Sequence, residues 1–246
     1  MGVTGLQFPP TNWPGGRYSF LLAALLLIFA IDPLLRDSVV SRTVLDILTI
    51  LLFVAGALSL GNRKLVWAIA AVLVGPELVG IGLGWLLEEH GSLGRGFGGT
   101  LRATAAIAFC AFMTSQVMRD VLSRKRVTSD TICASMCVYL LLGLLWAYLY
   151  LLIAHFVPGS FSANEELVVI ASAGDAGEAF SLLTYFSFVT LTTLGFGDIS
   201  PVSPIARTAC WMEAITGQLF LAILVAGLVG KFIAQGSEKP GDGSHE

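Results

Sequence analysis

The chain has 246 residues, of which 55% are hydrophobic and 13% are charged, and its formal net charge is -3. A soluble domain carries roughly a quarter charged residues, so this composition places the chain in a lipid bilayer. The basic residues form short clusters between apolar runs rather than one basic face. We therefore expect lipid as a partner and no nucleic acid.

Six apolar stretches are long enough to form membrane helices, since a helix needs about 20 mostly apolar residues to cross the hydrocarbon core. They are approximately Tyr18 to Leu35, Thr43 to Leu60, Leu65 to Leu87, Leu101 to Leu122, Thr131 to Phe156 and Ala206 to Ala234. The polar breaks between the first five stretches are short and leave no room for a soluble domain. The sequence thus predicts an all-α integral membrane protein with six transmembrane helices.

The distribution of basic residues predicts the orientation. With the N-terminus inside, nine Lys and Arg residues fall on the inner side and five on the outer side. Cytoplasmic loops are enriched in Lys and Arg, so we expect a multi-pass protein of the cytoplasmic (inner) membrane of a bacterial-type cell, with both termini in the cytoplasm.

The segment between the last two stretches differs from the others. Its apolar part, Phe180 to about Leu191, forms a helix of only ~18 Å at 1.5 Å per residue, too short for a ~30 Å core. It must enter the membrane and return. Non-helical backbone at that depth is tolerated only where it is buried in protein or lines a wet cavity. We expect the carbonyls of Thr193 to Gly197, which turn back, to face water or ions.

This returning segment carries a motif. The residues Thr192-Thr193-Leu194-Gly195-Phe196-Gly197-Asp198 resemble the potassium-channel signature Thr-Thr-Val-Gly-Tyr-Gly-Asp, with Leu for Val and Phe for Tyr. Glycine at alternate positions admits backbone angles closed to other residues, so successive carbonyls can point at one axis. Such carbonyls replace the hydration shell of a potassium ion.

The resemblance implies a selectivity filter with the following parts. The filter comprises Thr192, Thr193, Leu194, Gly195, Phe196 and Gly197, and K⁺ is bound by the carbonyls of Thr193, Leu194, Gly195 and Phe196 and by the Thr193 hydroxyl. K⁺ is then the permeant ion, and no cofactor is expected. One chain supplies one loop while an axial site needs several, so we expect a homotetramer.

The sixth stretch is similar to the inner helix of bacterial two-helix pore modules. From Gly195 to Gly217 is 22 residues (217 − 195), the filter-to-hinge spacing of that family. Gly217 is therefore either a gating hinge or a packing contact. By alignment onward, the cavity is lined by Gln218, Leu221, Val225 and Val229.

Two departures from the signature concern the support of the filter. Phe196 lacks the hydroxyl of the commoner Tyr, which bonds into a surrounding aromatic cuff, expected here at Tyr185 and Phe186. Val189 stands where some relatives carry an acid that pairs with the aspartate after the filter. Asp198 must therefore find another partner or stay in contact with water.

Six helices and one pore loop are also the layout of voltage-gated channels, but the fourth stretch lacks their charges. Voltage sensing needs roughly 3–4 gating charges per subunit. Arg102 and Arg119 lie at opposite ends of this stretch, and Ala103 to Met118 between them are uncharged. We interpret the two arginines as interface anchors and predict no steep voltage dependence.

Three acids lie within apolar stretches: Asp46, Glu77 and Glu213. A carboxylate at membrane depth is costly and is usually paired or functional. Two interpretations stay open for each acid, namely a gating or proton-linked role, or a structural hydrogen bond or interfacial position.

The predicted organisation has five parts. They are a cytoplasmic N-terminus (1–17), a four-helix peripheral membrane domain (18–122), a cytoplasmic linker (123–130), a pore domain (131–234) and a short cytoplasmic tail (235–246). Two other functions are open, a weakly selective monovalent cation channel and a non-conducting membrane sensor or scaffold. An enzyme is not expected, because the chain has three His and no Gly-x-Ser-x-Gly turn.

Overall fold

The computed structural model describes residues 16, 18–31, 51, 54–56, 75, 79, 92–124, 126–163, 166–167 and 175–237. Most of the second and third predicted helices, including Asp46 and Glu77, lies outside the described residues.

The described part is mainly helical. Its helices are α1 (Ser19–Ile31), α4 (Ser92–Ser123), α5 (Ser129–Phe156), α6 (Asp175–Leu191) and α7 (Pro204–Ser237). Three of them, α4, α5 and α7, contain stretches long and apolar enough to cross a membrane. Helices α5 and α7 begin two residues before their predicted starts and α4 begins nine residues before its own, and α7 continues past Ala234 to Ser237. These helices agree with the fourth, fifth and sixth predicted spans.

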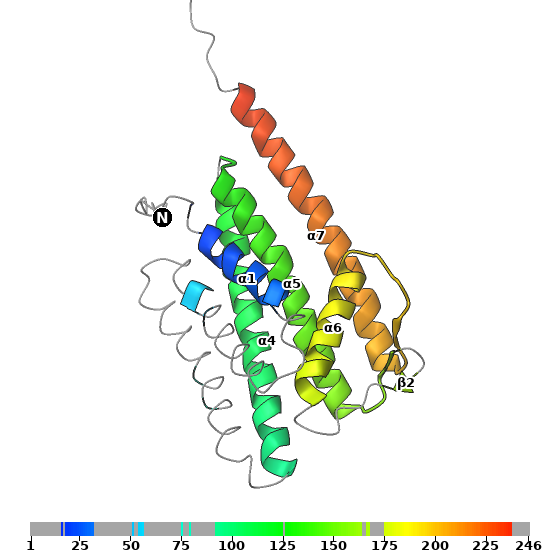
Figure 1. The fold of residues 1–246 in the computed structure, drawn as a ribbon. Helices are drawn as coiled ribbons and strands as arrows, with labels where there is room; N and C mark the ends of the chain where they lie inside the picture. The colour runs from blue at the N-terminus through cyan, green and yellow to red at the C-terminus, as the bar shows by residue number, and fades with distance from the viewer. Residues whose placement is uncertain are drawn as a thin grey trace, which may run out of the picture.

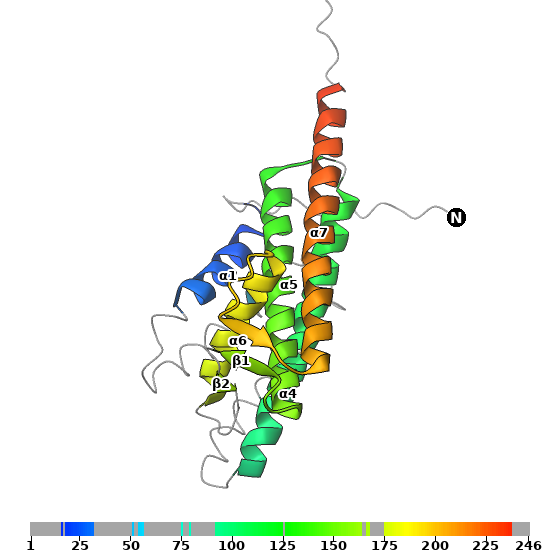
Figure 2. The ribbon, with the colours of Figure 1, turned by 90° about the vertical axis from the view of Figure 1, so that its right-hand side faces the viewer.

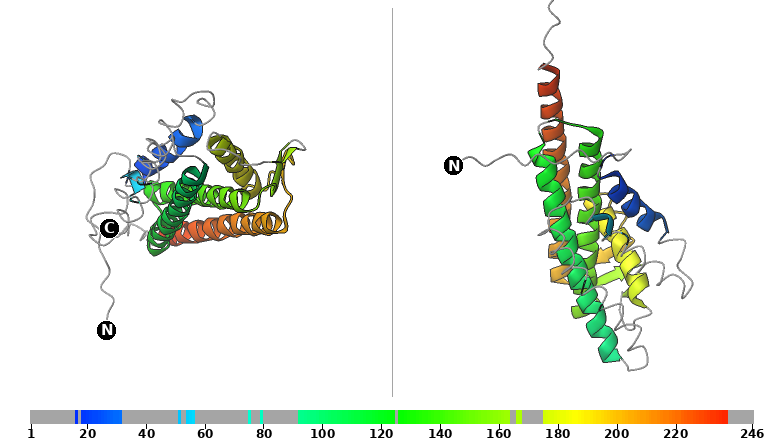
Figure 3. Two further views of the ribbon diagram at one scale, coloured as in Figure 1. Left: turned by 90° about the horizontal axis from the view of Figure 1, so that it is seen from below. Right: turned by 90° about the vertical axis from the view of Figure 1, so that its left-hand side faces the viewer.

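Helix α5 is the centre of the arrangement. It packs against α1, α4, α6 and α7, and the view from below in Figure 3 shows it lying between α6 on one side and α7 on the other. The helix begins with a capping box. The Thr128 side chain accepts a hydrogen bond from the Thr131 backbone N–H, and the Thr131 side chain accepts a hydrogen bond from the Thr128 backbone N–H. Through this central position α5 joins α1 and α4 to α6 and α7.

Two groups of buried side chains divide the core along α5. The first joins α1, α4 and α5 and includes Leu21, Phe109, Met113 and Leu141, none more than 1% exposed. The second surrounds Tyr150 and gathers side chains of α5, α6, α7 and the strands. Between membrane helices such contacts stabilise mainly through close packing, because lipid tails are as apolar as the side chains themselves.

A small antiparallel sheet departs from the all-α prediction. Its strands are β1 (Phe161–Ala163), β2 (Glu166–Leu167) and β3 (Ile199–Pro201), in the order β2-β1-β3. Ser162 of β1 lies opposite Ser200 of β3. Strands of two or three residues are too short to show an alternating pattern in a sequence. The sheet ties the chain just after α5 to the chain just after residues 192–198 (Figure 2).

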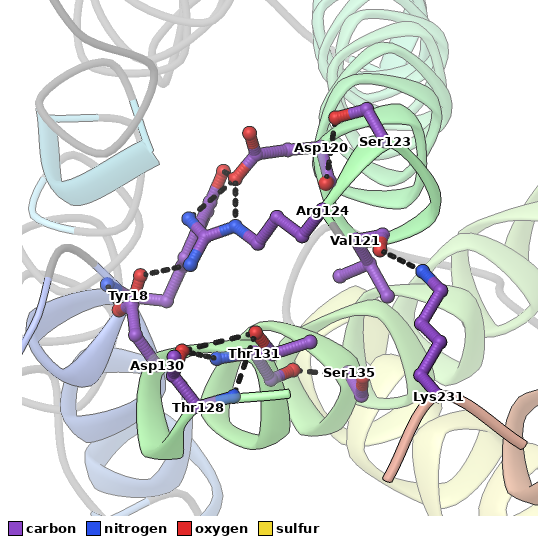
Figure 4. Close-up of polar contacts among 10 residues, drawn as sticks. All are labelled: Tyr18, Asp120, Val121, Ser123, Arg124, Thr128, Asp130, Thr131, Ser135 and Lys231. Carbon is purple, nitrogen blue, oxygen red and sulfur yellow. Dashed lines mark hydrogen bonds and ion pairs between the residues drawn. The ribbon is translucent and has the colours of Figure 1, made fainter. Parts of the chain in front are cut away.

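The connection between α4 and α5 is held by a network of charges (Figure 4). Arg124 lies 2.7 Å from Asp120 and 2.8 Å from Asp130. Burial by itself lowers the pKa of Arg124, but its hydrogen bonds and attraction to the two aspartates raise it above the ordinary value. The Tyr18 hydroxyl donates to Asp120 at 2.9 Å, and its backbone N–H donates to Asp130 at 3.0 Å. The start of α1 is thereby attached to the α4–α5 connection.

Lys231 of α7 reaches the same end of the molecule (Figure 4). Its ammonium donates to the backbone carbonyls of Val121 at 3.2 Å and Leu122 at 3.1 Å. The last carbonyls of a helix have no partner within the helix and carry its negative dipole end, so a cation there is favourable. This contact attaches the C-terminal part of α7 to the end of α4.

Candidate functional site: the loop between α6 and α7

Helix α6 enters the molecule from the sheet end and stops part-way along α5 and α7 (Figure 1). Its 17 residues measure about 26 Å at 1.5 Å per residue, and after Leu191 the chain turns back toward the sheet. We call residues 192–198 the return loop. Its course agrees with the predicted entry and return, although α6 begins five residues before the predicted Phe180.

The backbone φ angle alternates in sign along the return loop. Thr193, Gly195 and Gly197 have φ values of 58°, 60° and 79°, and the residues between them do not have positive φ. Glycine adopts positive φ freely, whereas for Thr193 the left-handed conformation costs roughly 1–2 kcal/mol. Alternation of this kind allows successive carbonyls to point to the same side of the chain.

The hydrogen bonds of the return loop run from its amides to the end of α6. The Thr192 N–H donates to Phe188 O at 3.0 Å, and the Leu194 N–H donates to Val189 O at 2.9 Å. In the described part of the chain, no hydrogen bond reaches the carbonyls of Thr193, Leu194, Gly195 or Phe196. These four residues are exposed. Because backbone carbonyls are strong acceptors, four free ones in succession form a candidate cation site.

Asp198, at the end of the return loop, is held by Tyr185 of α6. The Tyr185 hydroxyl donates to Asp198 Oδ2 at 2.8 Å, and the backbone N–H of Ile199 donates to Oδ1 at 3.0 Å. The hydrogen bond to Asp198 raises the pKa of Tyr185 above its ordinary value. Val189 cannot pair with Asp198, and Tyr185, one helical turn before Val189, supplies a hydrogen bond to Asp198 instead.

Phe186 packs against α5 and β1 within one chain. It is 4% exposed and its ring packs against those of Tyr150 and Phe161, at centroid distances of 5.2 and 5.6 Å. Phe196 is 65% exposed, and no ring contact joins it to Tyr185 or Phe186 within the described segments of one chain. Phe186 therefore anchors α6 to α5 and β1, and its place in a cuff around Phe196 stays a prediction.

Gly217 of α7 lies against the end of α6. A Cβ at this position would lie 2.5 Å from the Leu191 carbonyl oxygen and 2.9 Å from its Cδ1. Gly217 is also buried, whereas a Cβ at Gly227, ten residues further along α7, meets nothing within 4 Å. The packing interpretation of Gly217 thus has a structural basis, and the hinge interpretation stays a prediction.

The predicted cavity residues lie on the exposed side of α7. Gln218 Nε2 donates to Thr193 Oγ1 at 3.3 Å and so contacts the return loop directly. Leu221, Val225 and Val229 are 37%, 56% and 51% exposed. In a single chain these three side chains are therefore exposed, each by more than a third of its surface.

Glu213 lies behind the return loop and does not face it. It is fully buried between α5, α6 and α7, where its carboxyl group contacts the hydroxyls of Tyr150 and Ser187. The sequence singled out Glu213, but its two partners lie 63 and 26 residues away and carry no signal of their own.

Comparison with known proteins bears on this half of the chain. Residues 131–234 match a protein-family model described as an ion channel. An 84-residue part of the chain is also 30% identical to "Inward rectifier potassium channel Kirbac3.1" of Paramagnetospirillum magnetotacticum, which corresponds to 34% of this chain and 27% of that protein. The chain thus spans about a quarter of the length of this relative. No solved structure matches the chain.

The family match and the apolar helices together support a multi-pass membrane protein with an ion-channel region, and they point to a channel rather than an enzyme. The matched residues contain α5, α6, the return loop and nearly all of α7.

Proposed function

We propose that this chain is one subunit of a homotetrameric potassium-selective channel that conducts K⁺ passively across a bacterial-type cytoplasmic membrane without strong voltage dependence. The observation that carries the proposal is the return loop, in which positive φ alternates along the chain and four successive carbonyls lack hydrogen-bond partners. In this proposal the carbonyls of Thr193, Leu194, Gly195 and Phe196 and the Thr193 hydroxyl bind dehydrated K⁺.

The exposure of the return loop supports assembly of several copies. Leu194 and Phe196 are 57% and 65% exposed in one chain. Free carbonyls exposed to lipid cost several kcal/mol each, so the loop needs other protein or water around it. Four copies around an axis supply both, because the loops then face one another across a wet pore.

The surface of α7 supports the same assembly. Apolar side chains along its length are exposed, among them Trp211, Ile215, Leu219 and Ile223 at 50–65%. Far fewer residues are buried in the apolar part of α7 than in that of α5. In the proposed tetramer α7 is the inner helix, so neighbouring copies cover part of this surface and Gln218, Leu221, Val225 and Val229 line the cavity.

The proposed domain layout follows from these roles. Residues 131–234 form the pore domain, with α5 as outer helix, α6 as pore helix and α7 as inner helix, and residues 18–122 form the peripheral domain. Both termini are cytoplasmic in this proposal, which places the Lys231 contact with α4 at the inner end and the small sheet at the outer mouth.

A flux experiment tests the proposal. The full chain is reconstituted in liposomes, and uptake of K⁺, Rb⁺ and Na⁺ is compared for the wild type, Gly195→Ala and Gly227→Ala. A Cβ would have open space at both glycines. Only Gly195 has a positive φ, +60°, which a residue with a side chain rarely adopts. We expect the wild type to pass K⁺ and Rb⁺ in strong preference to Na⁺, Gly195→Ala to lose this flux, and Gly227→Ala to keep it.

Three other outcomes have definite meanings. Equal K⁺ and Na⁺ uptake contradicts selectivity and indicates a weakly selective cation channel. No uptake of any ion by the wild type contradicts conduction and favours a sensor or scaffold. Purified complexes whose mass is not that of four chains, measured in detergent by light scattering, contradict the tetramer.

A further inference from the structure

Glu213 has hydrogen-bonding partners on two other helices. The Tyr150 hydroxyl of α5 donates to Oε2, and Oε1 lies 2.5 Å from Ser187 Oγ of α6. Ser187 Oγ in turn lies 2.8 Å from the Gly143 carbonyl oxygen of α5. Tyr150, Ser187 and Glu213 are all 0% exposed. The four residues form one buried network that joins α5, α6 and α7.

The number of hydrogens in this network decides the state of Glu213. The Ser187 hydroxyl has one hydrogen, and the Gly143 carbonyl can only accept. Suppose first that Glu213 is ionised and that the Ser187 hydroxyl donates to the Gly143 carbonyl. The 2.5 Å contact between Ser187 Oγ and Glu213 Oε1 then has no hydrogen between its two oxygens. If the Ser187 hydroxyl instead donates to Glu213, the 2.8 Å contact between Ser187 Oγ and the Gly143 carbonyl oxygen has no hydrogen.

A neutral carboxylic acid satisfies every contact. Its Oε1–H donates to Ser187, Ser187 donates to the Gly143 carbonyl, and Tyr150 donates to Oε2. No ion pair to Glu213 is found within the described segments. A buried carboxylate without a cation is costly, so burial favours the neutral acid as well.

The network acts on the part of α6 that holds the return loop. Ser187 lies two residues after Tyr185, which binds Asp198, and two residues before Val189, whose carbonyl accepts the Leu194 N–H. A shift of Ser187 along α5 therefore moves both attachments of the loop.

The packing at Gly143 makes such a shift difficult. A Cβ at Gly143 would lie 2.5 Å from Cζ of Phe188, the residue after Ser187. The absence of a side chain at Gly143 thus lets α6 approach α5 closely enough for Ser187 to bind the backbone.

We propose that Glu213 is a positioning residue for the return loop, held as a neutral acid that donates to Ser187 and so fixes α6 against α5 and α7. This role goes beyond conduction itself and rests on the proposed function, because it concerns how the proposed filter is kept in place. Glu213 does not touch the permeating ion.

Infrared spectroscopy and matched variants test the proposal. Glutamine reproduces the neutral acid, because its NH₂ donates to Ser187 and its carbonyl accepts from Tyr150. In the infrared spectrum of purified protein we expect a buried carboxylic-acid C=O band that is absent from Glu213→Gln and shifted in Tyr150→Phe. A wild-type spectrum without a band that Glu213→Gln removes would overturn the neutral acid.

Hydrogen exchange and flux test the positioning. We expect Glu213→Gln to keep wild-type protection of the backbone amides of residues 192–195 and wild-type K⁺ over Na⁺ preference. Ser187→Ala should speed exchange of those amides and lower the preference, by up to about tenfold for one lost hydrogen bond. Equal behaviour of Ser187→Ala and the wild type, or loss of protection in Glu213→Gln, would overturn the role.

These readouts separate the two proposals. Absence of wild-type ion flux contradicts the proposed function, while the infrared band and the exchange of amides 192–195 still decide the role of Glu213. Glu213→Gln and Ser187→Ala change little volume, so they test the network without creating a large cavity.

Discussion

Side chains of α6 and α7 contact both ends of the return loop, in addition to its backbone hydrogen bonds. Gln218 contacts Thr193 at 3.3 Å near its start, and Tyr185 holds Asp198 at 2.8 Å at its end. The second contact joins a phenol to a carboxylate, and hydrogen bonds to charged groups are the stronger kind. Phe196 receives no such support from Tyr185 or Phe186 within the described residues of one chain. We therefore expect the Tyr185–Asp198 pair to brace this end of the loop.

Removal of the Tyr185 hydroxyl should loosen the end of the return loop. We expect Tyr185→Phe to lose K⁺ over Na⁺ preference severalfold and to inactivate faster, measured by bi-ionic reversal potentials and by current decay in planar bilayers. Thr184→Val is the control, because among the described residues the neighbouring Thr184 hydroxyl bonds only the Phe180 carbonyl of its own helix, at 2.7 Å. If Tyr185→Phe and Thr184→Val behave alike, the pair does not brace the loop.

Close packing between whole helices sets the position of α6. Gly143 lets α6 approach α5 at Phe188, and Gly217 lets α7 approach the end of α6 at Leu191. Small residues at such crossings are the usual means by which membrane helices come together. Gly143 of α5 and Gly217 of α7 thus each allow a close contact with the last turn of α6.

The contact between Gly217 and Leu191 gives a prediction for α7. In Gly217→Ala the new Cβ would lie 2.5 Å from a backbone oxygen, and relief of such overpacking typically costs about 1–3 kcal/mol. We expect a lower midpoint of thermal unfolding in detergent. Gly227→Ala, on the same helix with open space, should be neutral or up to ~1 kcal/mol more stable, since Ala has the better helix propensity. A Gly217→Ala protein as stable as Gly227→Ala would show that the contact has little effect.

At the scale of the whole molecule, α5 links α1 and α4 to α6 and α7. Arg124 and its two aspartates tie α1 and α4 to the start of α5, and Lys231 ties α7 to the end of α4. A movement of α4 relative to α5 would therefore displace Lys231 and with it the C-terminal part of α7. In its described side chains, however, α4 has no charge between Arg102 and Arg119 that could couple such a movement to voltage.

We expect the conductance to depend only weakly on voltage. A voltage sensor moves roughly 3–4 charges per subunit through the field, at about 2.3 kcal/mol per charge and 100 mV. Current–voltage relations of the reconstituted channel in symmetric K⁺ should yield a gating charge well below that of such a sensor. A gating charge of several elementary units per tetramer would contradict this prediction.

The sequence alone determined the features that depend on local composition and spacing. Apolar length located α4, α5 and α7, because crossing a bilayer sets a minimum length for a helix. The short apolar segment before Thr192 indicated a return, and alternating glycines at Gly195 and Gly197 indicated unusual backbone angles, which the structure has. Glu213 was recognisable as an acid out of place in an apolar run.

Only the tertiary structure decided which distant groups meet. The pairing of Tyr185 with Asp198, the network of Glu213 with Ser187 and Tyr150, and the pairing of β1 with β3 all join separate elements. Such contacts depend on the rotation of each helix about its axis and on its height against its neighbours. Those quantities come from the packing of side chains between helices, and no pattern within one segment encodes them.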